Sequence, residues 1–203
     1  MGNGVEQSIF LTNGVIRLGV AAASGKVCEL TDLRCGHNYV ARPDMGRLFR
    51  LIAPRTNLPG RHVDAHQATD VKVAVDEKKQ ELRLHYCSLR DGLGDPLSLQ
   101  ATVSLRLVDD SLICQLELAG LATQSLPEVF FPWLGGLGPA ENAESDVITM
   151  PSTWQRTVQQ PLRTLPDQRL GWNRSAAKRS WRYLENLVTA WVDYGGTGRG
   201  LAL

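Results

Sequence analysis

The amino-acid sequence predicts an all-β protein in which antiparallel strands form a two-sheet sandwich. Apolar and polar residues alternate over many short segments, turn-forming residues separate these segments, and almost none has helical periodicity. The clearest alternation covers residues 97–118. Its apolar positions are Leu99, Ala101, Val103, Leu105 and Leu107, followed by Leu112, Cys114, Leu116 and Leu118. Asp109-Asp110-Ser111 separates the two runs, so we expect two long strands joined by a tight turn in which aspartate tolerates unusual backbone angles.

The first quarter of the chain has the same alternation in shorter pieces. Asn13-Gly14, the commonest two-residue hairpin turn, joins the first two apolar runs, and Ser24-Gly25 turns the chain again. Pro54 ends the last run of this part, because proline cannot donate a hydrogen bond to a sheet. We expect strands at residues 8–12, 15–20, 27–33 and 48–53, with a loop over 34–46.

The middle of the chain contains a second hairpin. Residues 54–68 carry proline, glycine, asparagine and two of the four histidines, which favours an exposed excursion. Beyond it, residues 71–75 and 82–86 alternate around a charged turn. With the hairpin of residues 97–118, they predict four strands side by side in one antiparallel sheet, with one face in solvent.

The last third is less regular. We expect a strand at 128–134, a strand-like piece at 146–150 and a short helix at 175–185 within the long irregular span 140–187, and strands at 187–194 and from 201 onward. A long irregular span in a compact domain is commonly functional or disordered. The apolar residues at 201–203 favour the interpretation that the chain is the front part of a longer protein.

Length and composition favour one domain over residues 1–203, since 203 residues with 43% hydrophobic content can bury a sizeable core. The net charge of +1 gives no reason to expect nucleic acid or an anionic membrane as a partner. No targeting signal or membrane-spanning run is visible, which favours a soluble, cytoplasmic protein. The four cysteines lack the spacing of a zinc or redox site, so we expect neither a metal nor another cofactor.

All five tryptophans lie in the C-terminal part of the chain, from residue 133 onward. Flat aromatic rings on loops can stack on the C–H face of a sugar while polar neighbours bind its hydroxyl groups, although tryptophan is also common in protein cores. Trp191 lies in a predicted strand and suits the core. Trp133, Trp154 and Trp172 are therefore the candidate carbohydrate contacts.

No catalytic signature is evident among the acidic, histidine and serine residues. Most carboxylates lie at predicted hairpin tips, where surface charge is the ordinary explanation. His66 and Glu128 form the least implausible pair for proton transfer. The basic segment 163–182 could bind phosphates or an acidic partner, but the near-neutral total charge favours a solvated segment.

Several short motifs resemble one known family. They are Asn13-Gly14-Val15-Ile16-Arg17-Leu18, Gly25-Lys26-Val27, Leu30-Thr31-Asp32-Leu33, FPWLGGLGP at 131–139, Met150-Pro151, and Trp191-x-x-Tyr194 ahead of Gly200-Leu201. The sequence resembles the N-terminal β-super-sandwich of large glycoside-hydrolase-like proteins, which is similar to galactose mutarotase. The resemblance implies a super-sandwich followed by a C-terminal (β/α)8 barrel that carries the catalytic carboxylates and is absent from these residues.

Three functions remain open at this point. The first is a non-catalytic, carbohydrate-associated domain of a glycoside hydrolase, which supports or lines the sugar site of the following barrel. The second is a stand-alone aldose or hexose-phosphate epimerase that uses His66 and Glu128. The third is an interaction domain that uses the basic segment. Fold alone does not decide between them.

Overall fold

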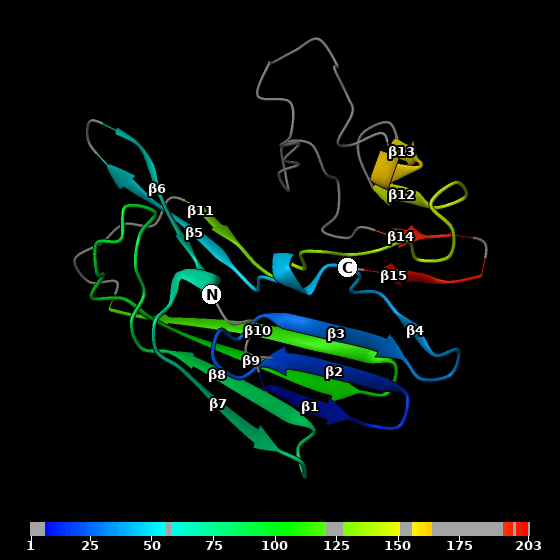
Figure 1. Cartoon of the computed structure of the whole chain (residues 1–203), viewed down its shortest axis with the longest axis horizontal. Helices are drawn as coiled ribbons and strands as arrows, with labels where there is room; N and C mark the ends of the chain where they lie inside the picture. Colours follow the sequence, from blue (N-terminus) through cyan, green and yellow to red (C-terminus); the bar gives the residue numbers. More distant parts are fainter. Residues whose placement is uncertain are drawn as a thin grey trace. The chain divides into compact units, whose positions relative to one another are not determined.

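The computed structural model describes residues 7–55, 58–120, 128–150, 156–163, 193–196 and 198–202. Within these ranges the chain forms fifteen strands in four small antiparallel sheets (Figure 1). The prediction of an all-β protein is confirmed. No helix in the described ranges combines the length and apolar character needed to cross a membrane.

The chain divides into two compact units, residues 1–137 and residues 138–203. The single domain predicted over residues 1–203 stays a prediction. The first unit contains three of the sheets and the second unit contains the fourth.

The first sheet of unit 1 has the order β1-β2-β3-β4. Its strands are Ser8–Thr12 (β1), Ile16–Ala21 (β2), Val27–Asp32 (β3) and His37–Asn38 (β4). The predicted Asn13-Gly14 turn is confirmed: the Asn13 Oδ1 accepts hydrogen bonds from the backbone N–H groups of Val15 and Ile16. The short strand β4 lies in the segment predicted as a loop.

The second sheet has the order β10-β9-β8-β7. Its strands are Val71–Asp76 (β7), Glu81–Tyr86 (β8), Gln100–Val108 (β9) and Ser111–Ala119 (β10). Both predicted hairpins and their adjacency are confirmed. Asp109 takes the left-handed conformation, with φ +52°, in the turn between β9 and β10. The up-and-down order of both four-stranded sheets is also the order found in β-propeller blades.

These two sheets pack against each other through their apolar faces. Alternate residues of β9 are buried, as predicted, and Leu18, Val20, Leu84 and Tyr86 have no exposed surface. The Tyr86 hydroxyl donates to the Gly25 carbonyl across this interface at 3.4 Å.

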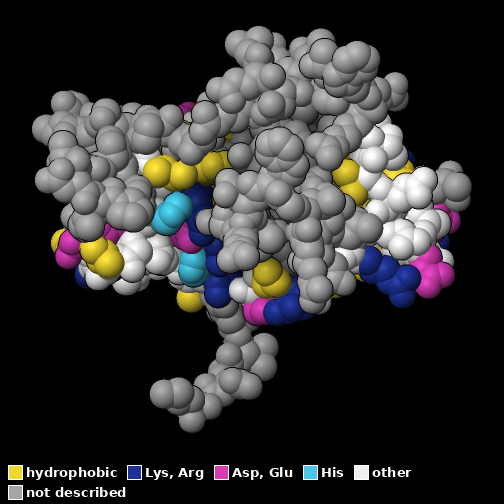
Figure 2. Space-filling model, turned by 90° about the horizontal axis from the view of Figure 1, so that it is seen from above, with side chains coloured by type: hydrophobic (Ala, Val, Ile, Leu, Met, Phe, Trp, Pro, Cys, Tyr) yellow, Lys and Arg dark blue, Asp and Glu magenta, His cyan; other side chains and the backbone are white. Residues whose placement is uncertain are grey.

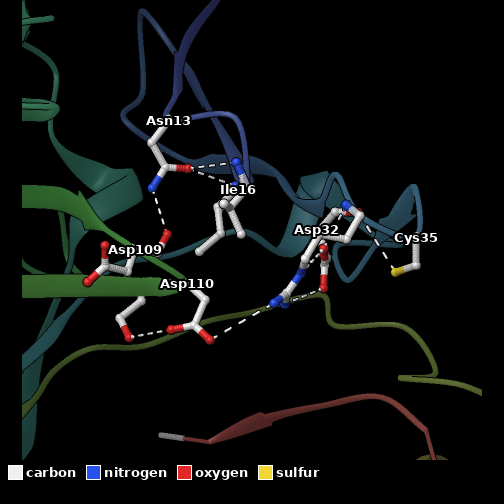
Figure 3. A network of polar contacts seen from close by, with 9 residues as sticks. Asn13, Ile16, Asp32, Cys35, Asp109 and Asp110 are labelled. Atoms are coloured by element: carbon white, nitrogen blue, oxygen red, sulfur yellow. Dashed lines mark hydrogen bonds and ion pairs between the residues drawn. The ribbon is translucent and has the colours of Figure 1, made fainter.

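At one edge, Asn13 Nδ2 donates to the carbonyl of Asp109 at 2.7 Å (Figure 3). In the same network Arg34 pairs with Asp32 and lies 4.0 Å from an Asp110 carboxylate oxygen. Turns of the two sheets are therefore held together by polar contacts at the rim of an apolar interface.

The third sheet of unit 1 has the order β11-β5-β6. Its strands are Arg50–Arg55 (β5), Leu58–Asp64 (β6) and Glu128–Phe130 (β11). The prediction that residues 54–68 form an exposed excursion is wrong, because β6 and the 3-10 helix Ala65–Gln67 (η2) occupy most of it. The strand tolerates Pro59 because it lies at the sheet edge, and it is anchored by the fully buried Val63.

The sheet of unit 2 has the order β13-β12-β14-β15. Its strands are Val147–Met150 (β12), Arg156–Gln159 (β13), Asp193–Gly195 (β14) and Gly200–Ala202 (β15). The fully buried Asp146 accepts hydrogen bonds from three successive backbone N–H groups, those of Ala140, Glu141 and Asn142. It also accepts one from the Tyr194 hydroxyl at 3.0 Å. This carboxylate fixes the loop that leads into β12. Strand β13 was not predicted from the sequence.

Candidate functional site

One face of the sheet β11-β5-β6 carries polar side chains. In an antiparallel ladder, directly paired residues project to the same face. Asp64 pairs with Arg50, which pairs with Phe130 on the other side, and His62 pairs with Ile52 in the adjacent row. Leu51 and Val63 project to the opposite face and are fully buried. The sheet therefore presents Arg50 and Asp64 side by side above an apolar layer.

Asp64 is the centre of this group. Its carboxylate accepts two hydrogen bonds from the Arg50 guanidinium, from Nε to Oδ1 and from Nη2 to Oδ2, the latter at 2.7 Å. Arg47 Nη1 donates a third, at 3.3 Å. The exposed fraction of the side chain is 7% for Asp64, 13% for Arg50 and 29% for Arg47. Arg47 is thus the arginine that solvent reaches.

Trp133 lies against both arginines. The guanidinium carbon of Arg50 is 4.4 Å from the centre of the ring and that of Arg47 is 5.2 Å from it. These are cation–π distances. The backbone N–H of Trp133 donates to the Leu48 carbonyl at 2.8 Å, which fixes the segment beside β5. The tryptophan therefore orients two cationic groups, and these already occupy part of its ring surface.

His66 completes the cluster. Its Nδ1 lies 3.9 Å from Asp64 Oδ2, and 30% of its side chain is exposed. The Nδ1 atom is buried and makes no hydrogen bond in the part of the chain that the structure describes. Burial lowers the pKa of His66, the positive charges of Arg47, Lys26 and Arg50 lower it further, and only Asp64 opposes them. His66 is therefore neutral near pH 7.

The pKa of Asp64 is also lowered. Burial alone would raise it, but the hydrogen bond from Arg50 and the charges of Arg50 and Arg47 outweigh the burial. The carboxylate is consequently ionised at neutral pH. We call Arg47, Arg50, Asp64, His66 and Trp133 the Arg–Asp–Trp cluster.

Histidine side chains are visible beside basic ones in the space-filling view (Figure 2). They lie over the part of the molecule where Figure 1 places β5 and β6. The side chains of Arg47 and His66 are both partly exposed. The cluster can offer guanidinium and imidazole groups to a ligand. Asp64 and Arg50 are its less exposed residues and lie beneath these groups.

The residues predicted from the sequence divide into three groups. Trp133 and His66, which belonged to different hypotheses, lie in the same cluster. Glu128 is in β11, where its backbone pairs with Ile52 and so shares a ladder row with His62, not His66. Trp154, Trp172, the predicted helix 175–185 and all of the basic segment 163–182 except Arg163 lie outside the described residues.

Arg47, Arg50 and Asp64 were not predicted from the sequence. A signal was present in His62, Asp64 and His66, which recur at every second position as they would along one face of a strand. It was overlooked because the segment was interpreted as a loop.

Unit 1 also has a pocket, and its lining residue Lys26 acts electrostatically on His66. The pocket has a volume of about 260 Å³ and is lined by Ser8, Ala21, Lys26, Cys28, Pro43 and Asp44. Cys28 and Ser8 make a long contact of 3.6 Å between sulfur and oxygen. No group of three or more histidine, cysteine or acidic side chains within the described ranges is arranged to hold a metal ion.

Comparison with known proteins gives no family for this chain. No family model matches the sequence, and no curated protein matches it significantly.

Proposed function

We propose that this chain is a non-catalytic carbohydrate-binding domain and that its saccharide site is the Arg–Asp–Trp cluster. The observation that carries the proposal is the convergence of an aromatic ring, two oriented guanidinium groups, a carboxylate and a neutral imidazole at one place. Saccharide sites combine apolar ring surface with a few fixed polar groups in this way.

The two accessible side chains supply the polar contacts. Arg47 uses one of its five N–H donors for Asp64 among the described residues, and His66 presents an imidazole that is neutral near pH 7. A sugar hydroxyl can accept a hydrogen bond from the Arg47 guanidinium. It can either donate a hydrogen bond to the His66 imidazole or accept one from it. Trp133 provides apolar surface and holds the arginines in place.

The wider setting that we propose follows the resemblance of the sequence motifs. The domain would be a galactose mutarotase-like super-sandwich that lines or supports the sugar site of a C-terminal (β/α)8 barrel in a glycoside-hydrolase-like protein. The two face-to-face sheets of unit 1 are compatible with this fold. The cluster lies outside these two sheets, on β11-β5-β6 and its flanking loops.

A glycan array followed by calorimetric titration tests the proposal. We expect the full chain to bind at least one saccharide and Trp133→Ala to weaken binding about tenfold or more, because the ring and the orientation of both arginines are lost. Phe10→Ala is the matched control: Phe10 is 50% exposed and has Arg17 at 5.7 Å from its ring, but lies on β1. Equal losses in both variants, or no binding by the wild type, would overturn the proposal.

His66 supports a second candidate function, the epimerase. A neutral imidazole beside an ionised carboxylate is suited to moving a proton on a sugar ring oxygen. NMR with the purified chain measures the exchange rate between the anomers of glucose, and likewise between those of galactose. This rate distinguishes the epimerase from the non-catalytic binding domain. Acceleration that disappears in His66→Ala would replace the binding proposal with this one, whereas an unchanged exchange rate would exclude it.

A further inference from the structure

The charges in the Arg–Asp–Trp cluster do not balance. Arg47 and Arg50 contribute two positive charges, Asp64 contributes one negative charge, and His66 is neutral near pH 7. One positive charge remains. Lys26 adds a further positive charge close enough to act on His66. A chain with a total charge of only +1 thus concentrates positive charge at this place.

The excess charge is located on the accessible arginine. Arg50 makes two bonds to Asp64 and is 13% exposed, so its charge is largely compensated. Arg47 makes one longer bond, of 3.3 Å, and is 29% exposed. Its position is nevertheless fixed, because Trp133 and Asp64 both contact its guanidinium. A pre-oriented, undercompensated guanidinium is suited to bind an anion with two parallel hydrogen bonds.

We propose that the ligand is an acidic saccharide that contains a uronic acid residue, an inference that rests on the function proposed above. Its carboxylate pairs with Arg47, and the sugar ring lies beside Trp133 and His66. One carboxylate neutralises the excess charge that Arg47, Arg50, Asp64 and His66 leave among themselves, without Lys26. A carboxylate can accept two parallel hydrogen bonds from the planar guanidinium. A phosphate ester, with a charge of about −1.5 to −2 at neutral pH, is the alternative anion, and glucose 6-phosphate tests it.

Titration calorimetry with paired ligands tests this assignment on the full chain. Each uronic acid trisaccharide, of glucuronate, galacturonate or mannuronate units, is compared with its methyl ester, which has the same ring but no charge, and with the neutral hexose trisaccharide. We expect at least one acid to bind about tenfold or more tightly than its ester, since hydrogen bonds between charged groups are strong. Raised salt should reduce this difference.

Variants of Arg47 locate the effect. Arg47→Met should weaken binding of the acid much more than binding of the ester and so remove the preference for the acid, whereas Arg47→Lys should retain part of the preference. Arg17→Met is the matched control, because Arg17 also lies over an aromatic ring and pairs with a carboxylate, that of Glu29. We expect it to bind like the wild type. Circular dichroism and thermal unfolding confirm that each variant is folded.

The possible outcomes separate this inference from the function on which it rests. If acid and ester bind equally, or if the preference survives in Arg47→Met, the acidic-saccharide assignment is overturned and carbohydrate binding stands. If glucose 6-phosphate binds more tightly than glucuronate, the anion is a phosphate and the assignment is likewise overturned. If no saccharide binds at all, both proposals fail.

Discussion

At the scale of single residues, Asp64 is the most consequential side chain of the cluster. It compensates one arginine almost fully and a second one partly, and it is 7% exposed. We expect Asp64→Asn to lower the free energy of unfolding by about 3 kcal/mol, since breaking a buried ion pair leaves a buried charge without its partner. Urea denaturation measures the change. Asp44→Asn is the control, because Asp44 and Arg42 form a similar pair that is exposed on both sides, and we expect almost no change there.

The stability lost in Asp64→Asn should depend on pH. The pKa of Asp64 is lower in the folded state than its ordinary value of about 3.9 in the unfolded chain. Its contribution to stability is therefore complete above the unfolded pKa and is lost as the pH falls through the folded pKa. The stability difference between wild type and Asp64→Asn should be constant above about pH 5 and should narrow below about pH 4. A difference independent of pH down to pH 2 would contradict this account.

Some residues of the site could be predicted from the sequence and others could not. Trp133 and His66 stand out because their side chains have few ordinary surface roles. Arg47, Arg50 and Asp64 are common surface residue types, and only the pairing of β5 with β6 brings residues 50 and 64 together. That pairing follows from tertiary register, which residue types alone do not specify.

At the scale of elements, the turn between β2 and β3 is packed tightly against β8. Gly25 has φ +66°, and a Cβ there would lie 2.5 Å from the hydroxyl of Tyr86, which is fully buried. Gly36 has nearly the same φ, +68°, but nothing lies within 4 Å of its Cβ position. Substitutions at the two glycines therefore distinguish the cost of the left-handed backbone conformation from the cost of close packing.

We expect Gly36→Ala to cost about 1 kcal/mol, the penalty for a left-handed alanine. Gly25→Ala should cost about 2–4 kcal/mol, because overpacking at the interface between the sheets adds to that penalty. Urea denaturation of both variants gives the comparison. Similar losses for the two would show that β8 is not packed against this turn.

The elements that the sequence predicted best are those with two-residue alternation and a recognisable turn. The β7–β8 and β9–β10 hairpins satisfy both conditions, and their pairing matches the prediction. Strand β6 was missed because Pro59 and Gly60 suggest a loop, although a sheet edge accepts them. Strand β13 was missed because Arg156–Gln159 is too short and polar to show a periodic pattern.

At the scale of the whole molecule, net charge is a poor guide to the site. The total of +1 argues against polyanionic partners, yet it conceals a local excess of positive charge at the Arg–Asp–Trp cluster. The division into two compact units was likewise not visible in the composition. Both properties arise from contacts between segments that are distant in the sequence.

The central claim is that the Arg–Asp–Trp cluster binds saccharide. The most direct measurement is an NMR titration of the ¹⁵N-labelled full chain with a uronic acid trisaccharide, following the indole N–H of Trp133, assigned with Trp133→Phe, and the backbone amides of residues 47–50 and 62–66. We predict concentration-dependent shifts that are largest for these signals. Shifts confined to the pocket lined by Lys26, Cys28 and Asp44, or none at any saccharide concentration, would contradict the account.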